Sequence, residues 1–435
     1  MGNQHSNDID NSVDNSKVDN SKNDNSGDNK FDNSGSIGNI GTFNISNLKQ
    51  GRSLGSSRPV VRQSINISGD VQLFQTLSRA NPSGNMLVSP LSISSALAMV
   101  YLGARGDTAA QMEKALSFQP GEDFHAEFKK FIEDINSPSK LYILQTANRL
   151  YGEKTAKFLP RFLDDTRKYY QADLKTVDFI GAAEASRVEI NTWVEQQTEN
   201  KIKDLVKPGI VSDGTKLVLV NAIYFKANWK NRFDEANTKE MPFKVSQTES
   251  KPVQMMFQKK NLPYKYITDH ALKILELPYV EEELSMLILL PKQSTDGSDP
   301  LLKLEKELTL QRLNEWTNKG NMLVHSDVHV HLPKFKLEED YKLNEPLSKL
   351  GMMDVFNPSK ADLSGMNSEG GLFLSEVVHK AFVEVNEEGT EAAAATAAVV
   401  TNGPCSFTAD HPFLFFIRHN KTKSILFLGR FSSPQ

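Results

Sequence analysis

The first fifty residues differ so sharply from the rest of the chain that they limit where a folded core can lie. They contain 12 Asn, 8 Ser and 7 Asp, and the triplet Asp-Asn-Ser recurs five times at irregular spacing. So polar a segment cannot offset the entropy of ordering its backbone, about 1–2 kcal/mol per residue, by burying apolar surface. We therefore predict a disordered tail over residues 1–62 and a single packed region over residues 63–435.

The average composition excludes several classes of protein. Lys and Arg number 50 and Asp and Glu number 54, and the resulting net charge of −4 does not favour binding to nucleic acid or to an anionic membrane surface. The single cysteine, Cys405, excludes an intrachain disulfide and a cysteine-built metal site. No apolar run is long enough for a membrane span, and the first thirty residues lack the apolar stretch of a signal peptide. We expect a cytoplasmic protein.

Two short motifs within the predicted tail carry little weight. Residues 1–6 fit the N-myristoylation pattern, in which Gly2 is the acceptor once Met1 is removed, but one acyl chain gives only marginal membrane binding. Residues 51–55 match the G-x-S-x-G elbow of hydrolases, with Ser53 in the nucleophile position. That elbow needs a strand before it and a helix after it, whereas polar linker sequence lies on both sides here. Gly2 stays a candidate acylation site, and Ser53 is not assigned as a nucleophile.

The remainder of the chain contains no motif for catalysis or cofactor binding. It has no phosphate-binding loop, no HExxH pair and no dinucleotide-binding glycine pattern. His329 and His331 are two residues apart in a predicted strand, so they share one face and could bind a metal. They lack an obvious carboxylate partner, and a polar solvent-side face opposite Val328 and Val330 explains them better. We predict no enzymatic activity, no cofactor and no metal site.

Hydrophobic periodicity after the tail predicts a mixed fold of helices and strands. Helical spacing is seen from Val71 to Leu77 and from Phe124 to Phe131, and Ser89-Pro90 has the form of a helix start with Ser89 as N-cap. Strands are predicted at 86–88, 217–220, 286–290 and 328–332. Because helices dominate the first half and strands the second, the pattern is typical of an α+β architecture.

The most informative segment extends from Glu387 to Val400. Its alanines favour a helix, because Ala has the highest intrinsic helix propensity. Read as a strand, it places Thr390, Ala392 and Ala394 on one face, which continues with small uncharged side chains. Such a face could be buried within a sheet without a steric clash or an unpaired charge. The segment could therefore enter a sheet as an additional strand.

This segment resembles the hinge and reactive-centre loop of the serpin family, and other motifs in the same order support the resemblance. Residues 89–97 are similar to the start of the shutter helix, 221–229 to a central-sheet strand with the breach tryptophan, 407–415 to the C-terminal signature and 425–431 to the last strand. The resemblance covers almost all of the chain after the tail. The chain end and the lack of a signal peptide are most similar to the intracellular, ovalbumin-like branch, near the leukocyte elastase inhibitors.

The resemblance implies one serpin domain with three β-sheets, about nine helices and an exposed reactive-centre loop. It also implies that a target serine protease, elastase-like or chymotrypsin-like, cuts the loop and is trapped when the loop inserts into the central sheet. About a dozen new ladder hydrogen bonds, at roughly 1 kcal/mol each, would supply on the order of 10 kcal/mol. That energy is comparable with the stability of an ordinary domain. A monomer is expected.

The resemblance also assigns roles to residues that match the family's motifs. The hinge would comprise Glu387, Gly389, Thr390, Glu391, Ala392, Ala393, Ala394 and Ala395. The shutter, a polar cluster under the central sheet that must open to admit the loop, would comprise Ser89, Ser92, Asn221 and His379. Trp229 would cap the breach at the top of the sheet, where Lys334 would pair with Glu387.

The loop departs from the family pattern near its end. Family spacing from Gly389 places the reactive bond at Gly403–Pro404, and the loop is about four residues short. Proline directly after the bond hinders most serine proteases, because it fixes φ and removes a backbone donor. Three alternatives stay open: cleavage shifts to residues 400–402, where small residues favour elastase-like enzymes; cleavage occurs at Cys405–Ser406; or the loop is a poor bait.

Two other functions compete with protease inhibition. A non-inhibitory serpin with a carrier, chaperone or storage role is the alternative that the shortened Gly-Pro loop suggests. The hinge face lacks the charged or bulky residues that would mark such a protein. Activation by a glycosaminoglycan would require a cationic helix face, and we interpret the scattered basic residues 154, 157, 161, 167 and 168 as solvated surface.

Overall fold

A computed structural model describes residues 68–121, 123–135, 142–388 and 405–435 of the chain. The predicted tail, residues 1–62, lies outside them. The described residues form nine α-helices: α2 (Ser68–Ala80), α3 (Pro90–Gly103), α4 (Gly106–Leu116), α5 (Phe124–Ile135), α6 (Pro160–Tyr170), α7 (Phe179–Gln197), α8 (Pro300–Glu307), α9 (Leu310–Thr317) and α10 (Asn344–Lys349).

Fourteen strands are present in the same described residues. They are β1 (Met86–Val88), β2 (Tyr142–Glu153), β3 (Lys175–Val177), β4 (Leu217–Ala227), β5 (Lys239–Lys244), β6 (Ser250–Ile267), β7 (Leu272–Pro278), β8 (Leu284–Pro291), β9 (Leu323–Pro333), β10 (Phe335–Lys342), β11 (Glu376–Val385), β12 (Cys405–Thr408), β13 (Phe413–His419) and β14 (Ser424–Phe431). Each strand and helix named in the sequence analysis is found at its predicted place, and the α+β class is confirmed.

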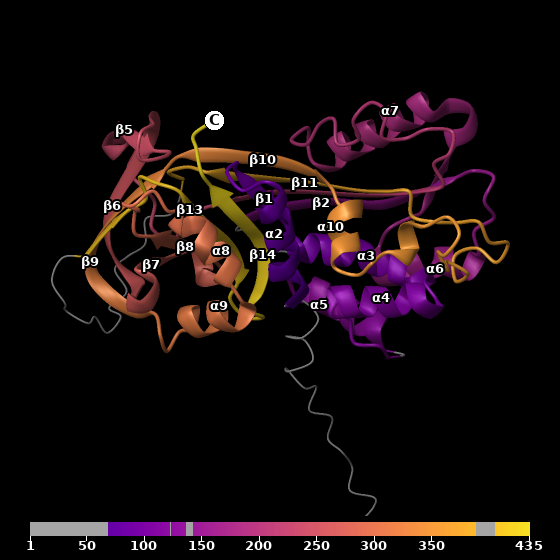
Figure 1. The fold of residues 1–435 in the computed structure, drawn as a ribbon, viewed down its shortest axis with the longest axis horizontal. Coiled ribbons are helices and arrows are strands. Elements are labelled where there is room, and N and C mark those ends of the chain that lie inside the picture. The colour runs from indigo at the N-terminus through magenta and orange to yellow at the C-terminus, as the bar shows by residue number, and fades with distance from the viewer. Residues whose placement is uncertain (1–67, 122, 136–141, 389–404) are drawn as a thin grey trace, which may run out of the picture. The chain divides into compact units, whose positions relative to one another are not determined.

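Backbone hydrogen bonds join these strands into two sheets (Figure 1). The five-stranded sheet has the order β10-β11-β4-β2-β3. The nine-stranded sheet has the order β1-β14-β13-β8-β7-β6-β9-β12, with β5 paired to β6. The long strand β6 pairs with β5 and β9 through residues 250–264 and with β7 through residues 264–267. Two of the three predicted sheets are therefore continuous through β6.

The five-stranded sheet contains a parallel pair at its centre. Strand β11 runs parallel to β4, in a register that extends from Glu376 opposite Val218 to Val383 opposite Phe225. On the outer sides, β10 is antiparallel to β11 and β2 is antiparallel to β4. We call the β11–β4 junction the seam.

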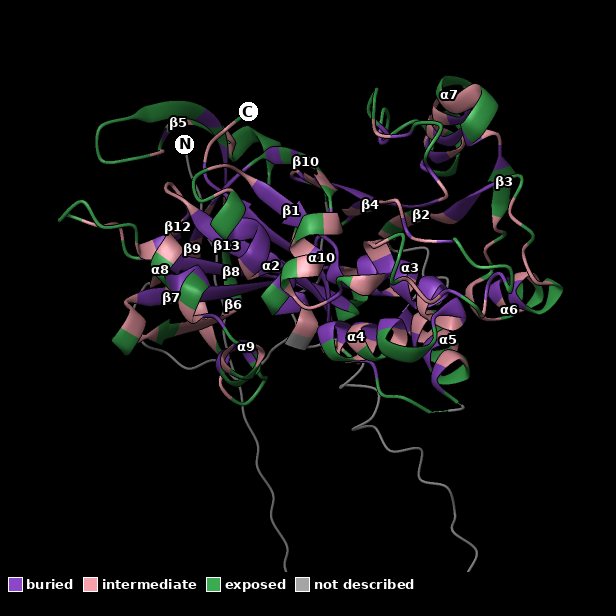
Figure 2. Ribbon diagram, turned by 45° about the vertical axis from the view of Figure 1, so that its right-hand side comes forward, coloured by how far each residue is buried: buried purple, intermediate pink, exposed green. Residues whose placement is uncertain are grey.

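Both faces of the five-stranded sheet are covered, which explains why β4 is a nearly continuous apolar run. Its inner face, with Ile223 and Phe225, packs toward α3 and the nine-stranded sheet. Its outer face, with Val220 and Tyr224, packs under α7, which lies on the opposite side of the sheet from α3 (Figure 1). Strands such as β8 and β13 are buried throughout, whereas α7 and β5 carry exposed segments (Figure 2).

Candidate functional site

The predicted loop begins where β11 ends. Residues 386–388 follow the strand and are described, and the chain is described again from Cys405, the first residue of β12. The hinge residues Gly389 to Ala395 and the proposed bond Gly403–Pro404 lie outside the described residues. The site can therefore be built from the two anchor points of the loop and from the sheet beside them.

A row of polar side chains crosses the middle of the sheet on its inner face. Tyr341 on β10, His379 on β11, Asn221 on β4 and Asn148 on β2 lie directly opposite one another in the strand register. His379 and Asn221 are fully buried. A ring nitrogen of His379, Nδ1, lies 2.5 Å from Oδ1 of Asn221, so this contact crosses the seam.

Helix α3 supplies two more members of this cluster. The amide of Asn221 donates to the hydroxyl of Ser92 at 2.6 Å, and also to Asn148. Ser89 is the N-cap residue of α3 and Pro90 the first residue of the helix, as predicted, but the hydroxyl of Ser89 donates to the carbonyl of Leu426 at 2.6 Å instead of capping the helix. Ser89 still adjoins the cluster, because its backbone N–H points at Nε2 of His379.

These contacts fix the protonation state of His379. The backbone N–H of Ser89 can only donate, so Nε2 of His379 must accept at 3.1 Å. The proton therefore resides on Nδ1 and is donated to Asn221, whose amide group donates onward to Ser92. Burial lowers the pKa of His379 to about 3, which keeps the ring neutral at physiological pH.

The buried histidine predicts a loss of stability in acid. Its pKa is lower in the folded chain than in the unfolded chain, where it is about 6.5, so the unfolded state takes up a proton first as the pH falls. The contribution is complete above pH 6.5 and is lost between about pH 6.5 and 3. Between pH 7.5 and 5.5 the resulting loss in the free energy of unfolding amounts to about 1.4 kcal/mol. Urea unfolding of the uncleaved chain should show this extra loss in the wild type relative to His379→Gln, and equal losses in both would contradict it.

Sequence reasoning did not identify Asn148 and Tyr341. Asn148 is a polar residue on the same face of β2 as the buried Leu150, and this break in the alternation was the available signal. Tyr341 stacks beside His379, with the ring centroids 6.4 Å apart and the planes 16° from parallel. Its hydroxyl accepts a hydrogen bond from the backbone N–H of Leu87 on β1.

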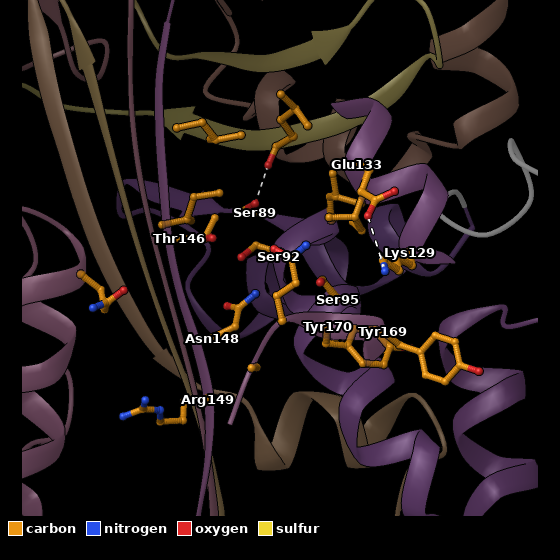
Figure 3. Close-up of a pocket in the computed structure, with 18 of the residues that line it drawn as sticks. Ser89, Ser92, Ser95, Lys129, Glu133, Thr146, Asn148, Arg149, Tyr169 and Tyr170 are labelled. Atoms are coloured by element: carbon orange, nitrogen blue, oxygen red, sulfur yellow. Dashed lines mark hydrogen bonds and ion pairs between the residues drawn. The ribbon is translucent and has the colours of Figure 1, made fainter. Parts of the chain in front are cut away.

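A cavity of about 590 Å³ adjoins the polar row along β2. Figure 3 shows Ser92 and Ser95 of α3 facing Thr146 and Asn148 of β2 across this space, with Tyr169 at the far side. Its walls include Asn148 of the row together with Ser89 and Ser92, so the cavity belongs to the same region of the sheet. Among the described residues, no group of three or more His, Cys, Asp or Glu side chains is placed to hold a metal ion.

The top of the sheet fixes the segment that leads into the loop. The indole N–H of Trp229 donates to the carbonyl of Asn386 at 2.8 Å, and its backbone N–H donates to the carbonyl of Glu388 at 3.0 Å. The indole ring stacks on Tyr279 at a centroid distance of 4.4 Å. Trp229 therefore binds the backbone on both sides of Glu387.

The side chain of Glu387 is held by two partners. Nζ of Lys334 lies 2.8 Å from one carboxylate oxygen, and the hydroxyl of Thr238 donates to the other at 2.8 Å. Burial acts to raise the pKa of Glu387, but the bonds from Lys334 and Thr238 outweigh it, and the pKa lies below its usual value. The structure thus brings together Glu387, Lys334 and Trp229, which the sequence placed at the breach.

The other end of the loop is anchored by β12. Cys405 lies opposite Val328 of β9 in a parallel ladder, and the buried ring of Phe407 follows two residues later. Lys273 donates to the backbone carbonyl of Ser406 at 2.9 Å. The neighbouring His329 and His331 share one side of β9, where the ring of Phe257 packs against both.

Most of the chain is similar to known proteins. A family model described as Serpin (serine protease inhibitor) matches residues 69–434. The chain is 55% identical over 368 residues to the leukocyte elastase inhibitor of Equus caballus, which covers 84% of this chain and 97% of that protein. It is 56% identical over 368 residues to the leukocyte elastase inhibitor of Homo sapiens, with the same shares covered.

Solved structures are also similar to the chain. Uncleaved ovalbumin superposes with a TM-score of 0.79 at 37% identity and covers 86% of this chain and 99% of its own. Maspin superposes with a TM-score of 0.81 at 36% identity and covers 87% of this chain and 100% of its own.

Proposed function

This chain belongs to the serpin family, and from that membership we propose that it inhibits serine proteases as a suicide substrate. The protease cuts the loop that follows β11, and the acyl-linked segment inserts between β11 and β4. The chain itself supplies no catalytic residue. It supplies bait and a sheet that can accept a further strand.

The parallel seam is the observation that carries this proposal. A segment that leaves the top of β11 and turns back would run antiparallel to both β11 and β4. Its entry would replace one parallel ladder with two antiparallel ladders, which are slightly more stable per residue. About a dozen additional hydrogen bonds give on the order of 10 kcal/mol, enough to drive a conformational trap.

The described residues at the hinge support the same mechanism. Trp229 and Lys334 hold the chain at residues 386–388, and the chain bends at Glu387, shortly before the predicted hinge residue Gly389. Gly389 would supply the flexibility at this point. Residues 390, 392 and 394 would then be the first to face inward, toward the polar row.

We assign the bait bond to the segment before β12. The alternative bond Cys405–Ser406 would require the first pairs of the β12–β9 ladder and the Lys273 contact to open. Gly403–Pro404 is the bond given by family spacing, and it lies only one residue from this ladder. Cleavage at 400–402 places the bond further from this ladder, and the relatives are named as elastase inhibitors. The proposed targets are therefore elastase-like proteases, with chymotrypsin-like proteases as the second class.

Incubation with elastase-like, chymotrypsin-like and trypsin-like serine proteases tests the proposal. We expect an SDS-stable complex with at least one of them, and none with the same protease after its catalytic serine has been blocked. The C-terminal fragment should leave only on denaturation, because its strand β13 is buried between β8 and β14. The mass of the released fragment locates the cut bond. Clean cleavage with no complex and no rise in thermal stability would instead support the non-inhibitory alternative.

We further propose that the domain spans residues 63–435, that the protein is a monomer, and that it binds neither nucleic acid nor a glycosaminoglycan. The basic residues near α6 support the last point, because Lys154, Lys157 and Arg167 lie next to carboxylates. A cytoplasmic location, with release from the cell by some other route, and acylation of Gly2 remain proposals from the sequence. In the described part of the chain, no helix has the length and apolar character needed to cross a membrane.

A further inference from the structure

A buried glutamate attaches the start of α7 to the end of β2. Glu153, the last residue of β2, is fully buried. One carboxylate oxygen accepts from the backbone N–H of Phe179 at 3.0 Å and from that of Ile180 at 3.4 Å. The other accepts from the backbone N–H of Thr155 at 2.8 Å and from its hydroxyl at 2.5 Å.

The attachment uses groups that the helix cannot satisfy itself. Phe179 and Ile180 are the first residues of α7, and the first N–H groups of a helix have no partner within it. A carboxylate at this end is further favoured by the helix dipole. Burial acts to raise the pKa of Glu153, but these hydrogen bonds outweigh it and lower the pKa, so the group is charged. The second carboxylate here, Asp178, accepts from Gly181 and is partly exposed.

All contacts of Glu153 lie on one side of the seam. Its backbone N–H donates to the carbonyl of Lys216, which directly precedes β4, and the residue lies opposite Val177 of β3. Because β2 and β4 are paired along eleven residues, β2, β3 and β4 move as one unit when the seam opens. Opening for one strand requires a separation of about 4.8 Å, and no contact of Glu153 crosses that gap.

The far end of α7 contacts both sides of the seam, and on the β2 side the ring of Trp193 packs on Arg149 and Tyr151. Val194 and the segment that follows α7 pack on an apolar cluster that includes Val378 and Phe382 of β11. Lys380 of β11 donates to the backbone carbonyl of Lys203 in that segment at 2.8 Å. The contacts with β11 cross the seam, so opening of the seam must disturb them. Ala182 interrupts the helix near its start, with φ −150° and ψ 54°, and marks the position where the helix can bend.

We propose that Glu153 is a positioning residue for the trapping step: it holds the start of α7 on the moving half of the sheet, so that the helix lifts from β11 as a strand enters and then covers it again. This inference rests on the proposed function. Because the start of α7 stays attached, the rest of the helix remains close to its docking surface. The helix therefore re-docks quickly, which speeds the completion of insertion. Protease capture at the loop, near β12, is independent of it.

Two variants of the full chain test the inference. Glu153→Ala removes the attachment, and Glu153→Gln keeps the size but directs an amide at donor groups. Asp178→Asn is the matched control, because it removes the partly exposed charge at the same helix end, with its ion pair to Lys154, and keeps an N-cap side chain. We expect Glu153→Gln to leave the rate of initial association with an elastase-like protease within twofold of the wild type. The number of inhibitor molecules consumed per trapped protease should rise at least about threefold. In Asp178→Asn both should remain unchanged.

Hydrogen exchange of the uncleaved chain gives a readout that does not depend on inhibition. Amides of residues 183–197 should exchange at least about tenfold faster in Glu153→Gln, whereas amides of β8 and β13 should not change. If the wild type traps no protease, the proposed function fails, and the exchange measurement still decides whether Glu153 holds α7. Unchanged exchange in α7, or an equal acceleration in β8 and β13, would overturn the inference. So would an unchanged partition between trapped and released protease, or the same change in Asp178→Asn.

Discussion

Thr390→Arg should abolish the SDS-stable complex and leave a protein that the target protease simply cuts and releases. Residue 390 is the first small residue on the face that would enter the sheet, and its own position lies outside the described residues. Insertion would bring an arginine to the inner face, beside Ile223 and Phe225, where burial without a partner costs several kcal/mol. That cost is a large part of the roughly 10 kcal/mol available. Insertion would therefore be slower than hydrolysis of the acyl bond.

Glu391→Arg provides the matched control. It introduces the same side chain one residue later, on the opposite face of the strand, where a charged residue already stands. We expect Glu391→Arg to form complex at close to the wild-type yield and Thr390→Arg to form less than about one hundredth of it. Gel electrophoresis after incubation with the protease measures both, and thermal unfolding of the cut products shows whether the loop has inserted. Equal yields would mean that the faces have been assigned incorrectly or that insertion does not occur.

The sequence predicted the architecture well wherever one face of an element is apolar and the other polar. Helix α5 and strand β9 were found in this way, because their alternation follows burial. Strand β2 was not found by its pattern. β2 pairs with β3 over only three residues. In the stretch of β2 that β3 does not cover, polar and apolar side chains are mixed on both faces. Two of the three predicted sheets form one continuous sheet, because β6 is long enough to pair with strands of both.

The candidate site shows which contacts a local pattern cannot contain. Ser89 has the form of an N-cap, yet its hydroxyl binds the carbonyl of Leu426, which is 337 positions away. Resemblance to a family brought Ser92, Asn221 and His379 together, although they lie in three distant parts of the chain. The register of four strands was needed to add Tyr341 and Asn148 to the same row.

Asn221→Ala should destabilise the uncleaved chain much more than the cleaved, inserted form. In the uncleaved chain, Asn221 accepts from His379 across the seam and donates to Ser92 and Asn148. Removing its amide leaves buried donors and acceptors without partners, at about 1–3 kcal/mol each. A total of about 3 kcal/mol would lower the melting temperature of a domain of this size by roughly 4 °C. The weakened seam should also open more often, so the uncleaved variant should lose inhibitory activity faster at 37 °C.

The inserted form should be less sensitive because the geometry of the row changes. A strand between β11 and β4 would place His379 and Asn221 two strand spacings apart, about 9.6 Å, which is too far for a hydrogen bond. The inserted form therefore has no His379–Asn221 hydrogen bond for Asn221→Ala to remove, and that part of the loss of stability is absent. Asn148→Ala is the control, because Asn148 and Asn221 stay neighbours on β2 and β4, and its cost should be similar in both forms. Equal costs of Asn221→Ala before and after cleavage would show that the loop does not enter between β11 and β4.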